Sequence, residues 1–300
     1  MAKARVIIKR RKAVRNIKKI TKVMQMIASS RYVKALRRAT GTKPYVKKIG
    51  ELIASVSQSV KASGAEVDHP LLRERTSKSG KTAVLVVTSN RGLAGGYNGG
   101  VLRLAMVTIR DLEAQGKTPL VYVSGKKGIA YFKFLRRDMA GTYTNIGDNP
   151  KYQDVEVLAE QFMKDYTDGK IDGLKVVYQR FISAGQQKPG AVDILPLSSL
   201  AAETVTKEGA PKAATTLYDF SPEPTLLLKE LIPAAVKASL FQAFIEAAVS
   251  EQIARMVAMK AATDNADKMG KQLTQEYNRA RQSQITSELS ELMGGVEALK

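Results

Sequence analysis

The chain contains no cysteine and only one histidine among its 300 residues. Without cysteine it can form no disulfide bond and perform no thiol chemistry. A single histidine also excludes a histidine metal cluster and a histidine-centred pair. We expect that residue, His69, to lie in a loop, because it precedes Pro70 in a polar stretch.

Long hydrophobic runs are missing as well. No stretch of about 18 apolar residues occurs, so the sequence predicts no membrane-spanning helix. The basic N-terminus lacks the apolar core of a secretory signal. An acid-free, Arg-rich start is also typical of mitochondrial transit peptides, but here it continues unbroken into a regular helical pattern, which favours mature protein. The apolar content of 44% predicts a folded protein of one large or two medium domains.

Acidic residues are absent from the first 48 positions, which hold 17 Lys and Arg. The first acid is Glu51, and from Thr225 onward nine basic residues balance nine acidic ones. The basic end therefore accounts for nearly all of the net charge of +20. Such an end predicts an acidic partner, which could be nucleic acid, a membrane surface or an acidic protein.

The first 60 residues have the hydrophobic periodicity of one helix, with a break or kink expected at Gly41 and Pro44. Lys18, Lys19 and Lys22 fall beside the apolar seam that we expect to face a partner helix. That expected seam consists of Ala13, Ile17, Ile20, Met24 and Ile27.

The middle of the chain changes to a pattern of alternating strands and helices. Short β-branched runs at 82–88, 120–124 and 174–181 predict buried strands, and 192–196 predicts an edge strand. Helical patterns at 101–115, 128–135 and 154–166 lie between them. This alternation predicts a mostly parallel sheet in a three-layer domain.

The C-terminal part predicts a second long helix over 233–293, which Gly294 and Gly295 would end. We therefore predict an α/β protein with a long coiled coil, in which the N- and C-terminal helices pair antiparallel around a Rossmann-like domain. The expected divisions are residues 1–62, 63–224 and 225–300. The seam of the second helix is Val249, Gln252, Met256, Met259, Thr263, Ala266, Gly270, Leu273, Tyr277 and Ala280.

The glycine-rich segment 88–98 follows a strand and precedes a helix, where a dinucleotide fingerprint would lie. Its glycines lack the G-x-G-x-x-G spacing, and the second strand does not end in an acid. A tight strand-to-helix turn is the favoured interpretation. A nucleotide-dependent enzyme and a nucleic-acid-binding protein remain alternatives, although no DNA- or RNA-binding motif occurs.

Acidic residues surround one predicted helix start but form no pair with a base or nucleophile. We interpret them as a solvated helix start that complements the helix dipole. These acids are Asp148, Asp154, Glu156 and Glu160.

Four segments resemble one known family, the gamma subunit of F-type ATP synthases, in its bacterial form. They are 16–30 (NIKKITKVMQMIASS), 90–98 (NRGLAGGYN), 250–266 (SEQIARMVAMKAATDNA) and 278–289 (NRARQSQITSEL). The resemblance runs across the whole chain. It implies a non-catalytic rotor shaft whose two terminal helices enter a hexamer of alpha and beta subunits. ATP, ADP and Mg would be held by those partners, and this chain would bind no cofactor.

The resemblance also implies further partners and a location. The α/β domain would meet the epsilon subunit and the membrane c-ring, and the delta subunit is a further implied partner. The resemblance implies no nucleic acid and no membrane span of this chain's own. The start at Met1 favours a peripheral protein on the cytoplasmic face of a bacterial plasma membrane. Two departures occur: Ala94 replaces the usual cysteine of the glycine-rich turn, and the chloroplast regulatory insert is absent.

The same resemblance implies roles for individual side chains. For contact with beta subunits it implies Lys18, Lys19, Lys22, Met24, Arg281 and Gln282. For coupling or helix–helix locking it implies Arg255, Met259, Thr286 and Glu288. For the c-ring or epsilon it implies Tyr218 and Phe220. An apolar tail fits an apolar sleeve, and it contains Leu289, Leu292, Met293, Val296 and Leu299.

Overall fold

The computed structural model of the chain describes residues 2–62, 69–72, 80–197 and 223–297. These residues form two compact units. The first combines Met1–Ser30 with Arg255–Lys300, and the second is Arg31–Ala254.

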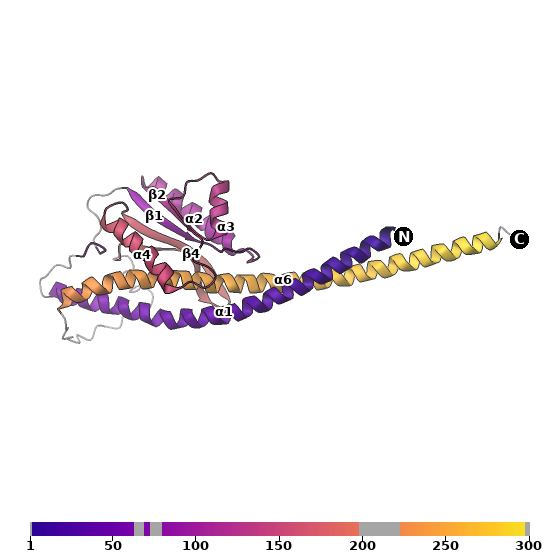
Figure 1. Cartoon of the computed structure of the whole chain (residues 1–300), viewed down its shortest axis with the longest axis horizontal. Coiled ribbons are helices and arrows are strands. Elements are labelled where there is room, and N and C mark those ends of the chain that lie inside the picture. Colours follow the sequence, from indigo (N-terminus) through magenta and orange to yellow (C-terminus); the bar gives the residue numbers. More distant parts are fainter. Residues whose placement is uncertain (1, 63–68, 73–79, 198–222, 298–300) are drawn as a thin grey trace. The chain divides into compact units, whose positions relative to one another are not determined.

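Two long helices contribute to both units: α1 (Ala2–Ala62) and α6 (Pro224–Glu297) (Figure 1). The expected break in the first helix is wrong, because α1 continues through Gly41 and Pro44. Proline removes one backbone donor, and the apolar residues buried before and after it, such as Ala39 and Ile49, hold the helix regular. The second helix likewise continues past Gly294, and it begins at Pro224, where a proline suits the first helical turn.

In the first unit, α1 and α6 pair along a narrow seam. On α6 the predicted seam is confirmed, since Met259, Thr263, Ala266 and Leu273 are buried. On α1 the predicted period is right but its phase is wrong. The structure buries Val14, Thr21 and Ala28, seven residues apart, whereas Ile17, Ile20 and Ile27 are 50%, 59% and 49% exposed.

Two stripes of α1 share the same 3-4 spacing and differ by one residue, or about 100° around the helix. The stripe with the larger apolar side chains was predicted to be the seam for that reason. The real seam uses small residues, which allow close approach: Val14 packs with Ala266 and Leu273, and the Thr21 and Thr263 hydroxyls lie 2.8 Å apart. The larger residues of α1 remain on an exposed face.

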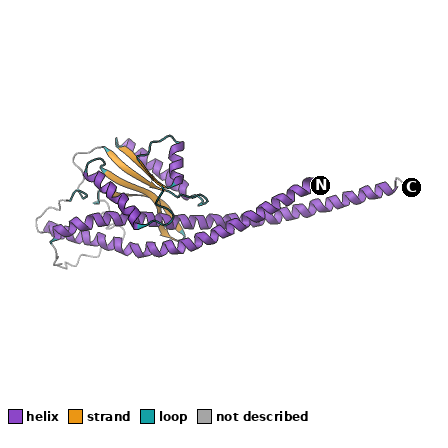
Figure 2. Ribbon diagram, in the orientation of Figure 1, coloured by secondary structure: helices purple, strands orange, loops and turns teal. Residues whose placement is uncertain are grey.

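The second unit is built on a five-stranded sheet with the order β3-β2-β1-β4-β5 (Figure 2). The first four strands run parallel, and β5 pairs antiparallel with β4. The predicted mostly parallel sheet is confirmed. Strand β3 was not predicted, because three residues are too few to show a pattern. The strands are β1 (Lys81–Val87), β2 (Thr118–Ser124), β3 (Gly141–Tyr143), β4 (Gly173–Ser183) and β5 (Gln186–Leu195).

Helices cover both faces of this sheet. On one face, α2 (Tyr97–Ala114) and α3 (Lys126–Phe134) pack on alternate residues of β1 and β2, such as Val84 and Val86. On the other, α4 (Tyr152–Thr167) and the unit's parts of α1 and α6 bury a larger core. The central strand β1 is apolar on both faces, as a strand covered on both sides requires.

By length and composition alone, the Leu226–Val296 part of α6 could cross a membrane, with a mean hydropathy of 1.4 in its most apolar stretch. However, 61% of that stretch is buried inside the protein. The apolar residues face the chain's own core, which is the pattern of a core helix.

Candidate functional site

The glycine-rich turn between β1 and α2 is closed by its own side chains. The Ser89 amide donates to Asn98 Oδ1 at 3.0 Å, and the Ser89 hydroxyl donates to the Arg91 carbonyl at 2.6 Å. Positive φ angles at Leu93 (62°) and Gly95 (55°) reverse the chain. Ala94 is 2% exposed, so this position of the turn is small and buried.

Close backbone packing fills the ends of β1 and β2, where a dinucleotide would otherwise bind. The Thr88 hydroxyl donates to the Ser124 carbonyl at 2.8 Å and accepts from the Gly128 amide at 2.9 Å. A Cβ on Gly125 would lie 2.1 Å from the Thr88 carbonyl oxygen. Gly125 and Gly128 therefore serve close packing of the chain after β2 against Thr88, whereas a Cβ on Gly96 or Gly99 would meet no atom within 4 Å.

Asn90 connects three loops at this edge of the sheet. Its amide nitrogen donates to the carbonyls of Thr144 and Ile146, at 3.3 and 3.5 Å, and its oxygen accepts from the Lys126 amide at 3.0 Å. One side chain thus connects the turn after β1, the start of α3 and the loop after β3.

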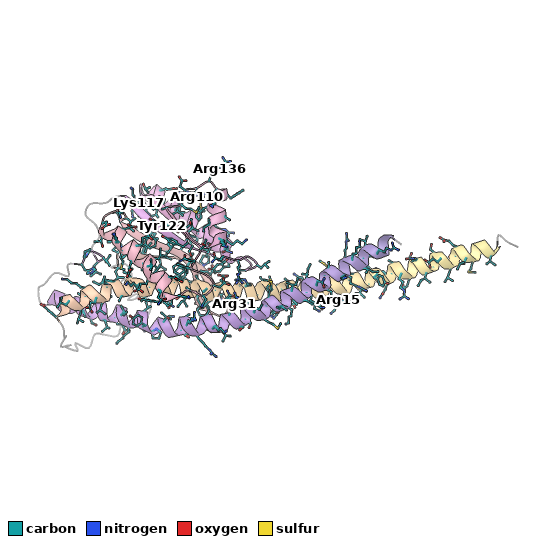
Figure 3. All side chains as sticks on the ribbon, in the orientation of Figure 1. Arg15, Arg31, Arg110, Lys117, Tyr122 and Arg136 are labelled. Carbon is teal, nitrogen blue, oxygen red and sulfur yellow. The ribbon has the colours of Figure 1, made fainter. Side chains whose placement is uncertain are left out.

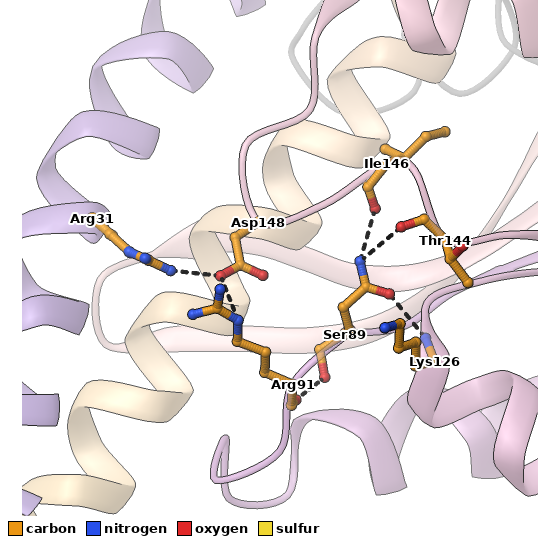
Figure 4. Close-up of polar contacts among 8 residues, drawn as sticks. Arg31, Ser89, Arg91, Lys126, Thr144, Ile146 and Asp148 are labelled. Carbon is orange, nitrogen blue, oxygen red and sulfur yellow. Dashed lines mark hydrogen bonds and ion pairs between the residues drawn. The ribbon is translucent and has the colours of Figure 1, made fainter.

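The neighbouring Asp148 ties the same loop to α1 (Figure 4). Its carboxylate is 2.6 Å from Arg31 on α1 and 4.0 Å from Arg91 in the glycine-rich turn. Arg38 of α1 also hydrogen-bonds to Asn149. These contacts make a polar clamp, formed by Arg31, Arg38, Arg91, Asp148 and Asn149, between α1 and the edge of the sheet. Sequence reasoning missed it, since it placed Asp148 at a solvated helix start.

The other acids of that group also differ in role. Glu156 and Glu160 of α4 both accept from Lys237 of α6, at 2.9 and 2.7 Å. Asp154 lies in the first turn of α4, as the dipole argument expects. Within the described part of the chain, no group of three or more His, Cys, Asp or Glu could hold a metal ion.

The basic residues implied by the resemblance divide into two kinds in the first unit. Lys18 forms an ion pair with Asp267, which Lys271 also reaches at 3.4 Å. These lysines lower the pKa of Asp267, with the Lys18 hydrogen bond as the main cause. Lys19 and Lys22 are exposed, and Lys22 lies 3.5 Å from Gln25 Oε1.

The remaining implied residues are spread along α6. Arg255 and Met259 are buried, whereas Arg281 and Gln282 are exposed. The Thr286 hydroxyl donates to the Gln282 carbonyl at 3.0 Å. Met24 on α1 is half-buried, and Glu288 of α6 accepts from Gln284 at 2.8 Å. Tyr218 and Phe220 lie outside the described residues.

Large apolar side chains remain exposed on both helices of the first unit. Those of α1 form the stripe that the seam leaves out, and those of α6 lie near its C-terminal end. Exposed apolar surface of this extent is typical of an interface. The residues are Ile17, Ile20, Val23, Met26 and Ile27 on α1, and Ile285, Leu289, Leu292, Met293 and Val296 on α6.

A family model described as ATP synthase matches residues 3–299. The ATP synthase gamma chain of Rhodopirellula baltica is 44% identical over 300 residues and is covered in full, as is this chain. The chain belongs to the ATP synthase gamma chain family. It is therefore a non-catalytic subunit. The gamma chain of Saccharopolyspora erythraea is 40% identical, with 100% of this chain and 98% of the relative covered.

Solved structures agree with the fold of this gamma chain. A chain from the Euglena gracilis mitochondrial ATP synthase rotor has a TM-score of 0.60 at 16% identity, covering 95% of this chain and 99% of its own length. A chain from the central stalk and c-ring structure of the Tetrahymena thermophila enzyme has a TM-score of 0.56 at 20% identity, with coverages of 81% and 99%.

Proposed function

We propose that this gamma chain is the central rotor shaft of an F-type ATP synthase, coupling ion flow through a membrane ring to ATP synthesis. One observation carries the proposal: α1 and α6 pair antiparallel through small seam residues, while larger apolar and basic side chains of α1 stay outside. Because α1 pairs with α6 through its smaller residues Val14, Thr21 and Ala28, its larger apolar residues remain available to a surrounding partner.

That outer face suits a hexamer of alpha and beta subunits. Apolar residues such as Ile17 and Ile20 would slide against an apolar sleeve, and exposed cations such as Lys19 and Lys22 would attract acidic loops without one deep lock. Rotation of an off-centre shaft would drive each beta subunit through its states in turn. ATP, ADP and Mg would reside on the alpha and beta subunits.

The individual contacts are part of the same proposal. We assign Lys18, Lys19, Lys22, Met24, Arg281 and Gln282 to beta subunits, and Arg255, Met259, Thr286 and Glu288 to coupling or helix–helix locking. We assign Tyr218 and Phe220 to the c-ring or epsilon. The delta subunit completes the partners, and the complex lies on the cytoplasmic face of a bacterial plasma membrane. Residues 1–62 and 225–300 would form the shaft, and 63–224 the domain beside it.

Charge reversal on the basic face tests the proposal. We expect Lys18→Glu/Lys19→Glu/Lys22→Glu to weaken ATP synthesis and ATP-driven ion pumping in membrane vesicles, with the α/β fold intact. Because Lys18 also pairs with Asp267, the Lys19→Glu/Lys22→Glu variant isolates the loss of partner attraction from damage to the helix pair.

The matched control reverses three exposed lysines of the second unit, Lys117, Lys126 and Lys133, which changes the net charge equally. Unaltered assembly and synthesis in both basic-face variants would count against the electrostatic part of the proposal. A pull-down with the tagged wild-type chain from its native membranes tests the shaft role itself. Recovery of no alpha and beta subunits would contradict that role.

A further inference from the structure

A groove of about 480 Å³ lies between α1 and α6 in the first unit. Arg11, Arg15 and Lys18 line it from α1, and Asp267, Gly270 and Lys271 line it from α6. Arg15, labelled in Figure 3, follows Arg11 by four residues and precedes Lys18 by three, so all three project from one face of α1.

The charge of this groove is not balanced by the chain. Its single carboxylate, Asp267, is shared by Lys18 and Lys271. Arg15 has no ion pair with any residue that the structure describes, and the guanidinium of Arg11 lies over the Tyr277 ring, 5.0 Å from its centre. Two arginines and two lysines against one carboxylate therefore leave the groove strongly positive.

The groove also has room for a ligand. Gly270 lines the groove, and a Cβ added there would meet no atom within 4 Å. The volume is in the range of small-ligand sites, about 300–1,000 Å³. It exceeds the needs of one carboxylate and suits a diphosphate group.

We propose that the groove formed by Arg11, Arg15, Lys18 and Lys271 beside Gly270 is a binding site for a phosphate-class anion, such as pyrophosphate or the diphosphate group of a nucleotide. Guanidinium forks form paired hydrogen bonds with phosphate oxygens, and the lysines add point charges. An anion held there bridges α1 and α6. The site needs no rotor role and is measured on the chain alone.

The test is equilibrium binding of pyrophosphate to the purified full-length chain at about 0.15 M salt, where the Debye length is about 8 Å and loose counterion attraction is weak. We expect one saturable site with a sub-millimolar dissociation constant. The Arg15→Gln/Lys271→Gln variant should bind about tenfold more weakly, since it removes charge-assisted hydrogen bonds.

Gly270→Met supplies a second variant that changes no charge. Its side chain enters open space and improves helix propensity, so the helix pair should remain folded while the groove is filled. The control for charge is Lys34→Gln/Lys43→Gln, two exposed positions of α1 outside the groove. Far-ultraviolet circular dichroism of all variants verifies the helices.

Each outcome has a defined meaning. Loss of binding in both groove variants, with binding kept in the control, supports the site; competition by ADP or by inorganic phosphate then identifies the source of the phosphate group. Equal binding by every variant, or no saturable binding by the wild type, would overturn it. If a hexaglutamate peptide displaced pyrophosphate with higher affinity, the proposal would be wrong, because the groove would then bind an acidic protein segment in preference to a small anion.

Discussion

The Asp148 carboxylate lies 2.6 Å from the Arg31 guanidinium, although 117 residues separate them in the chain. Arg31 belongs to α1, and Asp148 belongs to the loop between β3 and α4. Arg91, in the turn after β1, reaches the same carboxylate. If α1 turns in the assembled enzyme, this contact helps the sheet domain to turn with it.

Removing the charge of Asp148 should therefore weaken the second unit. We expect Asp148→Asn to lower the free energy of unfolding by about 1 kcal/mol, because the pair is only partly shielded from solvent. Urea unfolding at low salt measures the change, which should shrink as salt rises. Asp138→Asn, at an exposed position without an ion pair among the described residues, is the control. Equal effects of both substitutions would contradict the clamp.

Two glycines, Gly125 after β2 and Gly96 in the glycine-rich turn, should differ sharply in their tolerance of alanine. In Gly125→Ala the new Cβ would meet the Thr88 carbonyl oxygen at 2.1 Å, and the φ angle of +98° is unfavourable for alanine. We expect a loss of more than about 3 kcal/mol, or no soluble protein, since two backbone segments must separate. Gly96→Ala meets nothing within 4 Å and should fold normally. Thermal unfolding of both variants provides the comparison.

A hydroxyl pair in the seam of the first unit gives a prediction about the helix pair. The Thr21 and Thr263 hydroxyls lie 2.8 Å apart, and each also approaches a carbonyl of its own helix. Replacing both with valine keeps the shape and removes two buried polar groups, so Thr21→Val/Thr263→Val should unfold at a higher temperature than either single variant. The expected coupling is about 0.5–1 kcal/mol. Purely additive effects would mean that the hydroxyls do not interact.

Periodicity in the sequence was sufficient to predict the two long helices and the parallel strands, but it could not fix the phase of α1. The stripe through Ile17 and Ile20 and the stripe through Val14 and Thr21 have the same spacing. The first stripe is exposed in this chain, whereas the second packs against Thr263, Ala266 and Leu273 of α6. The sequence of α1 therefore shows the helical repeat, but the residues that pack on α1 determine which of its faces is buried.

The candidate site shows a similar division. The glycine-rich turn could be interpreted as a tight strand-to-helix turn because its spacing was wrong for phosphate binding. The positive φ angles of Leu93 and Gly95 and the buried Ala94 agree with that interpretation. The clamp at Asp148 could not be predicted, since opposite charges 117 residues apart show no local pattern. Lys18, Lys19 and Lys22 all lie beside the seam and are exposed, but Lys18 also forms an ion pair with Asp267, which the sequence did not indicate.

Lys237 makes the connection between α6 and α4 sensitive to alkaline pH. Its ammonium group lies 2.7 Å from Glu160 and 2.9 Å from Glu156. Hydrogen bonds to Glu160 first, and then to Glu156, raise the pKa of Lys237 above its ordinary value of 10.5. A raised lysine pKa means that its contribution to stability is complete below the unfolded-state pKa and is lost as the pH rises through the folded-state pKa.

We therefore expect the wild-type chain to lose stability above about pH 10.5 more steeply than Lys237→Met does, because the variant has no proton to lose there. Burial raises the pKa of Tyr143 to about 12, which adds an alkaline loss of the same sign to both proteins. The difference between them, taken from urea unfolding at neutral pH and at successive alkaline pH values, isolates Lys237. Lys229→Met, at an exposed position of α6, should keep the wild-type slope. A Lys237→Met curve parallel to that of the wild type would mean that the two carboxylates do not hold this proton.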